Sequence, residues 1–304
     1  MTDKNEIKAN KNALKILQEA ETAMENVGKK TPLTHCITNI VTTNDCANAA
    51  LAVGGSPIMA DDSEEIKEIV DMADVLVINI GKLSKEQIAA IEVGAKHANE
   101  TNTPIVVDPV GAGISGLRNR VIKDLAENYQ LAAIRGNMSE IKAIANLVGL
   151  EIESQENEDS KGGKGVDVAE DDVISEDNLE KNGKLVKELA KKLNTVIGTS
   201  GPIDIISDGE KTFAIDNGDE MMPRITGSGC MLTTIIGTYN GANDPLIATI
   251  TASLIMAIAG EEAAKEVRAN DLGTGSFRAY LIDYLYKLKH ADILEKANLY
   301  EISV

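Results

Sequence analysis

Cysteine is scarce in this sequence, and its spacing suits neither a zinc site nor a disulfide framework. The 304 residues contain three cysteines, Cys36, Cys46 and Cys230. The number is odd, and none of them stands in a Cys-x-x-Cys or Cys/His spacing. We therefore expect a protein of a reducing compartment, the cytoplasm.

The sequence also has fewer basic than acidic residues and no long apolar run. Lysine and arginine number 30 against 48 acidic residues, which gives a formal net charge of −18. This charge repels phosphate backbones and anionic lipid, so we expect no nucleic acid and no membrane partner. The longest apolar run, Leu246 to Gly260, is too short to span a bilayer, and residues 1–30 lack the apolar core of an export signal.

What the sequence does contain, from about residue 33, is a regular alternation of strand and helix patterns. This alternation predicts an α/β fold: a three-layer α/β/α sandwich with a mostly parallel sheet, in one domain over 1–304. We expect strands at 33–37, 56–60, 74–80, 103–113, 132–136 and 194–201, and a hairpin over 202–216 that turns at Asp208-Gly209. We expect helices at about 5–27, 42–55, 63–73, 84–100, 117–128, 138–149, 183–193, 228–240, 245–267 and 275–290, with Ser63 and Ser84 as N-terminal caps of two of them.

One stretch breaks this rhythm. Residues 151–181 are acidic, contain glycine and have almost no large apolar side chains. A segment of this composition cannot bury enough apolar surface to order itself, so we expect a long, mobile excursion at the surface.

Residues with unusual chemistry follow the predicted strands. In an open α/β sheet, ligands bind outside the carboxyl ends of the strands. The residues at these positions are Thr38-Asn39, Met59, Asp108-Pro109, Arg135-Gly136-Asn137, Ser200-Gly201 and, beyond the hairpin, Thr226 to Cys230. The sequence therefore predicts a site at this edge.

The segment GSGC, Gly227-Ser228-Gly229-Cys230, comes directly before a predicted helix. A glycine loop at a helix N-terminus directs backbone N–H groups at one point and suits phosphate, although a tight turn that only packs is the alternative. The helix N-terminus and a nearby cation would lower the pKa of the Cys230 thiol, which could then accept a proton or attack. The alternative for Cys230, and our expectation for Cys36 and Cys46, is a small buried hydrophobe.

Three oxygen-bearing side chains suggest a metal at the same edge. Asn137 and Glu140 are three residues apart at the start of a helix and so lie on one face, where Asp108 could join them. Carboxylate and amide oxygens suit hydrated Mg²⁺, although an ordinary helix cap is the alternative. The charged side chain of Arg135 is costly to bury without a partner, and we expect its guanidinium to contact an anion. Together these features indicate phosphoryl transfer from a nucleotide.

Several long stretches in this order resemble the hydroxyethylthiazole kinases of the ribokinase-like superfamily. The resemblance runs from Pro32 to about Tyr284 and rests on PLTHCITNIVTTNDCANAALAVGGSPIMA, VVDPVGAG, IRGNMSEI, KGVD, TSGPIDIISDG and RITGSGCMLT. It implies transfer of the ATP γ-phosphate, with Mg²⁺, to the primary hydroxyl of 4-methyl-5-(2-hydroxyethyl)thiazole in thiamine salvage. It also implies a homotrimer with its active sites between subunits.

The resemblance assigns roles to the residues at the sheet edge. Asn39, Val41, Met59 and Gly227 would bind the thiazole, Arg135 and Ser200 would bind ATP, and Asp108, Asn137 and Glu140 would organise Mg²⁺ and phosphates. Gly227, Ser228 and Gly229 would form an anion hole beside Cys230, which stands where most ribokinase-like enzymes have an aspartate base. The chain departs from the family pattern in its longer N-terminal segment, in its 151–181 excursion and in GSG where GTG is common.

Three competing interpretations remain open at this stage. The chain resembles other small-molecule kinases of the superfamily, such as a hydroxymethylpyrimidine kinase. It could also be a non-catalytic sensor of thiazole or nucleotide that kept the pocket. A cysteine acyl transferase would need a histidine near Cys230, and the only candidates are His35, a strand residue, His97, on a helix surface, and His290.

Overall fold

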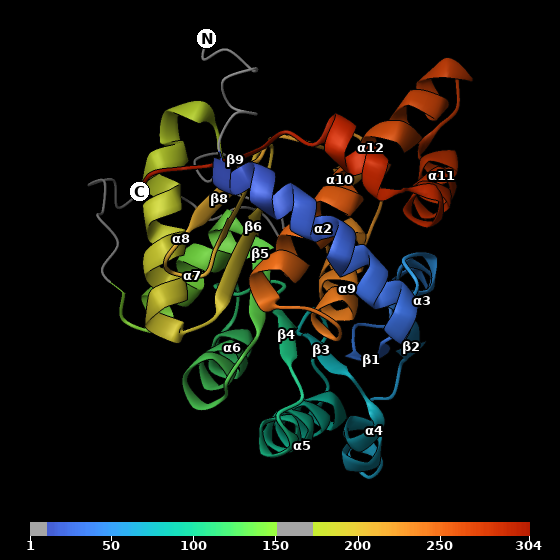
Figure 1. Ribbon diagram of the computed structural model, residues 1–304. Helices are drawn as coiled ribbons and strands as arrows, with labels where there is room; N and C mark the ends of the chain where they lie inside the picture. Colours follow the sequence, from blue (N-terminus) through green and yellow to red (C-terminus); the bar gives the residue numbers. More distant parts are fainter. Residues whose placement is uncertain (1–10, 151–172) are drawn as a thin grey trace.

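The computed structural model describes residues 11–150 and 173–304, and its centre is a nine-stranded mixed sheet (Figure 1). The strand order is β2-β1-β3-β4-β5-β6-β7-β8-β9, with β1 to β6 parallel and β7 to β9 antiparallel. The strands are β1 Leu33–Ile37, β2 Ser56–Ile58, β3 Val75–Asn79, β4 Ile105–Asp108, β5 Ala133–Asn137, β6 Val196–Ser200, β7 Asp204–Ser207, β8 Thr212–Ile215 and β9 Leu299–Glu301.

Helices cover both faces of this sheet, as the alternating pattern predicts. On one face lie α2 Lys11–Lys30, α3 Thr43–Ala52, α9 Ser228–Asn240, α10 Pro245–Ala269, α11 Thr274–Lys287 and α12 His290–Lys296. On the other lie α4 Ile66–Met72, α5 Lys85–Thr101, α6 Gly116–Asn128, α7 Met138–Leu147 and α8 Leu179–Leu193. The three-layer α/β/α prediction is therefore confirmed.

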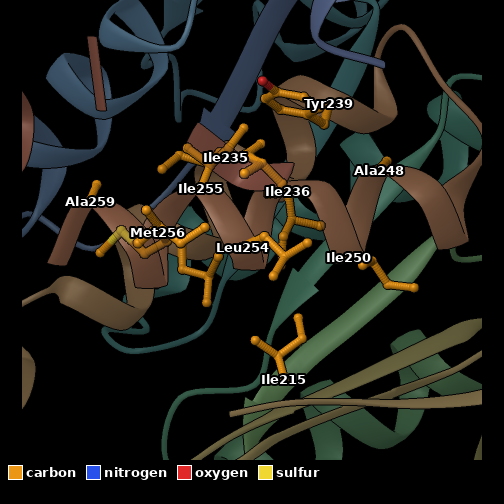
Figure 2. Close-up of a cluster of buried hydrophobic side chains, with 14 of the residues drawn as sticks. Ile215, Ile235, Ile236, Tyr239, Ala248, Ile250, Leu254, Ile255, Met256 and Ala259 are labelled. Atoms are coloured by element: carbon orange, nitrogen blue, oxygen red, sulfur yellow. The ribbon is translucent and has the colours of Figure 1, made fainter. Parts of the chain in front are cut away.

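Each face of the sheet contributes to its own hydrophobic core, because successive strand residues point to opposite sides. Val106 packs toward the α9 and α10 side, whereas its neighbour Val107 packs toward the α5 and α7 side. Figure 2 shows part of the first core, where Ile236 of α9 lies among side chains of α10 such as Leu254. All five residues of β3 are buried, which explains its nearly continuous apolar sequence.

The strand order reverses between β1 and β3. From β1 the chain passes through α3, on one face, to the edge strand β2, and it returns through α4, on the other face, to β3 on the opposite side of β1. In open α/β sheets such a reversal opens a crevice at the carboxyl ends of the two strands, where ligands bind. The expected binding position therefore lies beyond Ile37 and Asn79.

Helix α9 approaches the sheet closely enough to bring its first turn to that crevice. A Cβ atom on Gly237 would lie 2.2 Å from Cγ2 of Val77 in β3, and one on Gly55 would lie 2.5 Å from Cγ2 of Thr238 in α9. Glycine at these two positions thus lets the helix lie directly on β1, β3 and β4.

Several predicted boundaries differ from those in the structure. Helix α4 begins at Ile66 after Glu65, without a side-chain cap, so the predicted Ser63 cap is wrong, whereas the Ser84 capping box of α5 is present. Strand β4 ends at Asp108 rather than at residue 113, because Pro109 and the positive φ angles of Gly111 and Gly113 end it.

The predicted excursion over 151–181 is wrong for its last part, residues 173–181. Ile174 is buried in the core and α8 already begins at Leu179, so residues 173–181 belong to the folded structure. Residues 151–172, which include the KGVD stretch, lie outside the described residues. Residues 5–10 of the predicted N-terminal helix also lie outside them. The described part of this helix, α2, extends to Lys30 rather than to residue 27. Helix α12 and strand β9 were not predicted.

Helix α10 is longer than the apolar run that marked it. Among the described residues it is the one helix that is long and apolar enough, by composition, to cross a bilayer, yet 78% of the apolar window is buried inside the protein. Its apolar side chains form part of the core shown in Figure 2, as expected for a central helix of a globular protein.

Candidate active site

The thiol of Cys230 lies at the centre of the predicted edge. It is in the first turn of α9, and its Sγ accepts hydrogen bonds from Nδ2 of Asn79, at 3.2 Å, and Nδ2 of Asn39, at 3.6 Å. The carboxylate of Asp108 lies close enough for its negative charge to act on the thiol, and Asn79 also donates to this carboxylate. Residues that follow or end β1, β3 and β4 therefore meet at one sulfur atom.

The predicted low pKa of Cys230 is wrong. Burial and the negative charge of Asp108 raise the pKa of the thiol to about 12, and these effects exceed those of the hydrogen bonds that favour the thiolate. The cysteine beside the glycine loop is therefore a neutral thiol near pH 7. Cys36 and Cys46 are fully buried, as predicted.

Asp108 and Glu140 form a pair of buried carboxyl groups. Asp108, at the end of β4, accepts a hydrogen bond from Nδ2 of Asn79 at 2.8 Å. Glu140 accepts from the backbone N–H groups of Gly111 and Asn137, each at 2.8 Å. Burial, followed by the charge of Asp108, raises the pKa of Glu140 to about 7. Burial also raises the pKa of Asp108, against the opposing effect of Arg135.

Asn137 and Glu140 also form a capping box, so the capping alternative considered for them is confirmed. The side chain of Asn137 accepts from the backbone N–H of Glu140 at 2.9 Å, and Glu140 returns the bond to the backbone N–H of Asn137. Together with the bond from the N–H of Gly111, the capping box engages both carboxylate oxygens of Glu140. Within the described residues, no group of three His, Cys, Asp or Glu side chains could hold a metal by itself.

The guanidinium of Arg135 reaches from β5 to the glycine loop. Its Nε donates to Oγ of Ser200 at 3.0 Å, which fixes the side chain along the end of β6. A Cβ atom on Gly229 would lie 2.7 Å from Nη1 of Arg135, so the cation rests against the first turn of α9. Buried Asp204, whose pKa is raised to about 6 by burial, accepts from the N–H of Gly201 beside Ser200.

The glycine loop requires its glycines. Gly227 has φ +84°, a left-handed conformation, and a Cβ atom there would lie 2.5 Å from Cγ2 of Thr42. The N–H groups of Ser228, Gly229 and Cys230 belong to the first helical turn and have no acceptor within the helix. Beside a guanidinium, this turn can hold an anion.

Three of the four predicted thiazole residues, Asn39, Val41 and Met59, follow β1 and β2, and the fourth, Gly227, precedes α9. Asn39 is buried and its Oδ1 accepts from the N–H of Val41 at 3.1 Å. Met59 lines a hollow together with Thr38 and Ile40. Val41 and Ile40 are 67% and 71% exposed, so two large apolar side chains beside Asn39 face solvent. A larger hollow lies elsewhere, between α2 and the α9–α10 connection, away from these polar groups.

Sequence reasoning missed Asn79, the residue that joins Asp108, Cys230 and Asn39. The signal was present, since Asn79 is the only polar residue in the otherwise apolar strand VLVIN and stands at its carboxyl end. Asp204 was also missed, because a carboxylate inside a hairpin strand looks like a turn residue.

None of the described histidine contacts involves Cys230. His35 contacts the carbonyl of Ala60 and His290 that of Leu17, while His97 pairs with Asp71 at 2.7 Å. Burial lowers the pKa of His35, as expected for a neutral strand histidine. Within residues 11–150 and 173–304, the cysteine acyl transferase interpretation therefore lacks the base it needs.

Comparison with known proteins agrees with this arrangement. The profile of the hydroxyethylthiazole kinase family matches residues 24–291. The chain belongs to the hydroxyethylthiazole kinase family. A hydroxyethylthiazole kinase from Methanobrevibacter smithii is 57% identical over 288 residues, which cover 95% of this chain and 98% of that protein. The predicted family resemblance is therefore confirmed.

Solved structures agree on the fold. The structure of a hydroxyethylthiazole kinase protein from Pyrococcus horikoshii OT3 is 34% identical, covers 94% of this chain and 100% of its own, and superposes with a TM-score of 0.82. A ribokinase-like superfamily protein from Enterococcus faecalis, 14% identical, covers 91% of this chain and 95% of its own with a TM-score of 0.55. The fold is ribokinase-like, with a mixed rather than wholly parallel sheet.

Proposed function

We propose that this protein transfers the γ-phosphate of ATP to the primary hydroxyl of 4-methyl-5-(2-hydroxyethyl)thiazole, for thiamine salvage. Membership of the kinase family supports the reaction class and the alcohol. The observation that carries the proposal is the meeting of Cys230, Asp108 and Arg135 at the first turn of α9. Such a turn with a guanidinium beside it binds phosphate, and a carboxylate and a thiol lie next to it for the alcohol.

Arg135 and Ser200 bind the nucleotide in this proposal. The bond from Nε of Arg135 to Ser200 leaves both terminal nitrogens of the guanidinium for phosphate oxygens. The N–H groups of Gly227, Ser228 and Gly229 form an anion hole for the transferred group, where charge is spread over its equatorial oxygens. The excess of negative charge on the chain makes this local positive region important for holding ATP.

The pair Asp108 and Glu140 fits a magnesium ion. Burial, followed by the charge of Asp108, raises the pKa of Glu140, and burial raises that of Asp108 even though Arg135 opposes both shifts. A further cation would favour the ionised carboxylates, and Mg²⁺ binds one or two protein carboxylates together with phosphate oxygens. Asn137 would contribute through the capping box that orients Glu140. Bound Mg²⁺ would neutralise charge on the phosphates of ATP.

Cys230 positions the attacking hydroxyl. As the alcohol oxygen bonds to the γ-phosphorus, the bond from phosphorus to the β-phosphate oxygen breaks, and the hydroxyl proton must leave. A neutral thiol beside the Asp108 carboxylate can accept this proton on sulfur only as it passes its own to that carboxylate. Because the transition state is loose, the proton leaves late, and we expect Cys230 to assist rather than to be essential.

A homotrimer in which a second subunit covers the thiazole site fits the exposed apolar residues. Ile40 and Val41 stand beside Asn39 and Met59 with most of their surfaces uncovered. An apolar patch next to a binding site is a common place for a subunit contact. Ile40→Asp should weaken both assembly, measured by light scattering after gel filtration, and thiazole turnover.

Three free cysteines, two of them buried, fit a cytoplasmic location.

A coupled ADP-release assay with magnesium and ATP tests the function. The thiazole alcohol and the hydroxymethylpyrimidine are offered separately to the wild type and to Cys230→Ala. We expect turnover with the thiazole and a kcat roughly 10- to 100-fold lower in the variant. Preference for the pyrimidine would make the protein another kinase of the superfamily. Thiazole binding by folded protein without any turnover would make it a sensor.

A further inference from the structure

We propose that Asn79 is a positioning residue for the phosphoryl transfer, acting by holding Cys230 and Asp108 in one fixed relation. The inference rests on the proposed function of this site but concerns a residue to which that function assigns no role. Asn79 is 3% exposed and ends β3, on one side of the crevice where the strand order reverses. It lies at the point where the polar groups from three strands and α9 meet.

The orientation of the Asn79 amide is determined by the backbone. The N–H of Gly81, which can only donate, lies 2.9 Å from one end of the amide, so this end is Oδ1. The other end is therefore the NH₂ group. One of its hydrogens goes to Oδ2 of Asp108, at 2.8 Å, and the other to Sγ of Cys230, at 3.2 Å.

A second amide supports the first. Oδ1 of Asn79 also accepts from Nδ2 of Asn39 at 3.1 Å, so all four hydrogen-bonding positions of Asn79 are occupied. Asn39 is oriented in the same way, by the N–H of Val41, and it also donates to Cys230, at 3.6 Å. A buried network in which every group is satisfied fixes its members in one arrangement.

The two contacts to Cys230 differ in a way that suggests their roles. The bond from Asn39 is the longer one, and Asn39 is the residue proposed to face the thiazole, so an incoming hydroxyl can replace it at the sulfur. The bond from Asn79 is shorter and lies on the side of Asp108. Asn79 would keep the sulfur in place while the hydroxyl binds, and its effect should therefore fall on kcat.

Space around the amide is limited, which makes its position sensitive to small changes. A Cβ atom on Gly81 would lie 2.9 Å from Oδ1 of Asn79 and 3.2 Å from Nδ2 of Asn39. Displacements of about 1 Å in an active site can lower rates by about 100-fold. Glycine at 81 thus allows the N–H to approach and orient the amide.

The test is a double-mutant cycle with Asn79→Ala and Cys230→Ala, assayed with ATP, magnesium and the thiazole alcohol. We expect Asn79→Ala to lower kcat by roughly 10- to 100-fold, with KM values for both substrates changed by less than about threefold. In the Cys230→Ala background the same substitution should lower kcat at least about fivefold less, because its partner is gone. Asn79→Asp, which keeps the shape and the acceptor but loses both donors, should be impaired at least as much.

A matched control separates this role from a structural one. Asn240→Ala removes a buried amide at the opposite end of α9, where Nδ2 bonds the carbonyl of Ile236, and it should leave kcat within about twofold. Full activity of Asn79→Asp, equal effects of Asn79→Ala in both backgrounds, or a parallel rise of KM with loss of thermal stability would each overturn the proposal. Wild-type turnover and the Cys230→Ala single variant test the proposed function independently.

Discussion

Glu140 should make the metal-free protein less stable as the pH rises. Its pKa is about 7 in the folded protein against an ordinary value of 4.5, because burial and Asp108 disfavour its charged form. The folded state thus holds this proton more tightly than the unfolded chain does. The stabilisation is complete below pH 4.5 and is lost as the pH rises through 7. At about 1.4 kcal/mol per pH unit, this interval corresponds to about 3 kcal/mol.

Urea unfolding in EDTA, followed by circular dichroism from pH 4.5 to 8, measures this loss. Other buried groups also make stability depend on pH. Burial raises the pKa of Asp108 and of Asp204, which act in the same direction as Glu140, and it lowers that of His35, which acts in the opposite direction. The decisive quantity is therefore the difference between the wild type and Glu140→Gln. We expect the wild type to lose about 3 kcal/mol more than the variant across this range.

The same measurement can refute the reasoning. If wild type and Glu140→Gln show the same dependence of unfolding free energy on pH, Glu140 is ionised in the folded protein and burial does not control it. With magnesium and ATP present, the difference between the two proteins should shrink, because a bound cation favours the ionised carboxylate. A difference that magnesium and ATP leave unchanged would count against Asp108 and Glu140 as the metal-binding pair.

Two substitutions of glycine test the close contacts of α9. Gly229→Ala should displace the guanidinium of Arg135 and raise the KM for ATP by roughly tenfold in steady-state kinetics. The KM for the thiazole should stay within about twofold. An unchanged KM for ATP would contradict the placement of Arg135. Gly237→Ala should press α9 away from Val77 and lower the free energy of unfolding by about 1–3 kcal/mol in urea. Unaltered stability would show that α9 can move at no cost.

Much of this fold could be predicted because its signals are local. The apolar run of β3, the capping box at Ser84 and the hairpin at Asp208-Gly209 each depend on residues close together in the sequence. Strand β9 could not be predicted in this way. Its three residues form a strand only because β8 offers an open edge, with Ala214 opposite Tyr300.

The site shows the same division. The rule that ligands bind beyond the carboxyl ends of strands selected Asp108, Arg135 and Cys230 from the sequence alone. The pKa of Cys230 was predicted in the wrong direction, because the helix N-terminus is visible in sequence whereas burial beside Asp108 is not. Asn79 was missed for a related reason. Its role depends on contacts with Asp108, Cys230 and Asn39, which are distant in the sequence.

Packing and chemistry are linked in this protein through α9. Gly237 lets the helix lie against β3, and the same helix delivers Cys230 to Asn79 at the end of that strand. A side chain at position 237 would therefore move the sulfur as well as loosen the core. The close contact in the middle of the helix therefore also supports the geometry at its first turn. Gly237, two turns away from Cys230, thus helps to place the thiol for the proposed reaction.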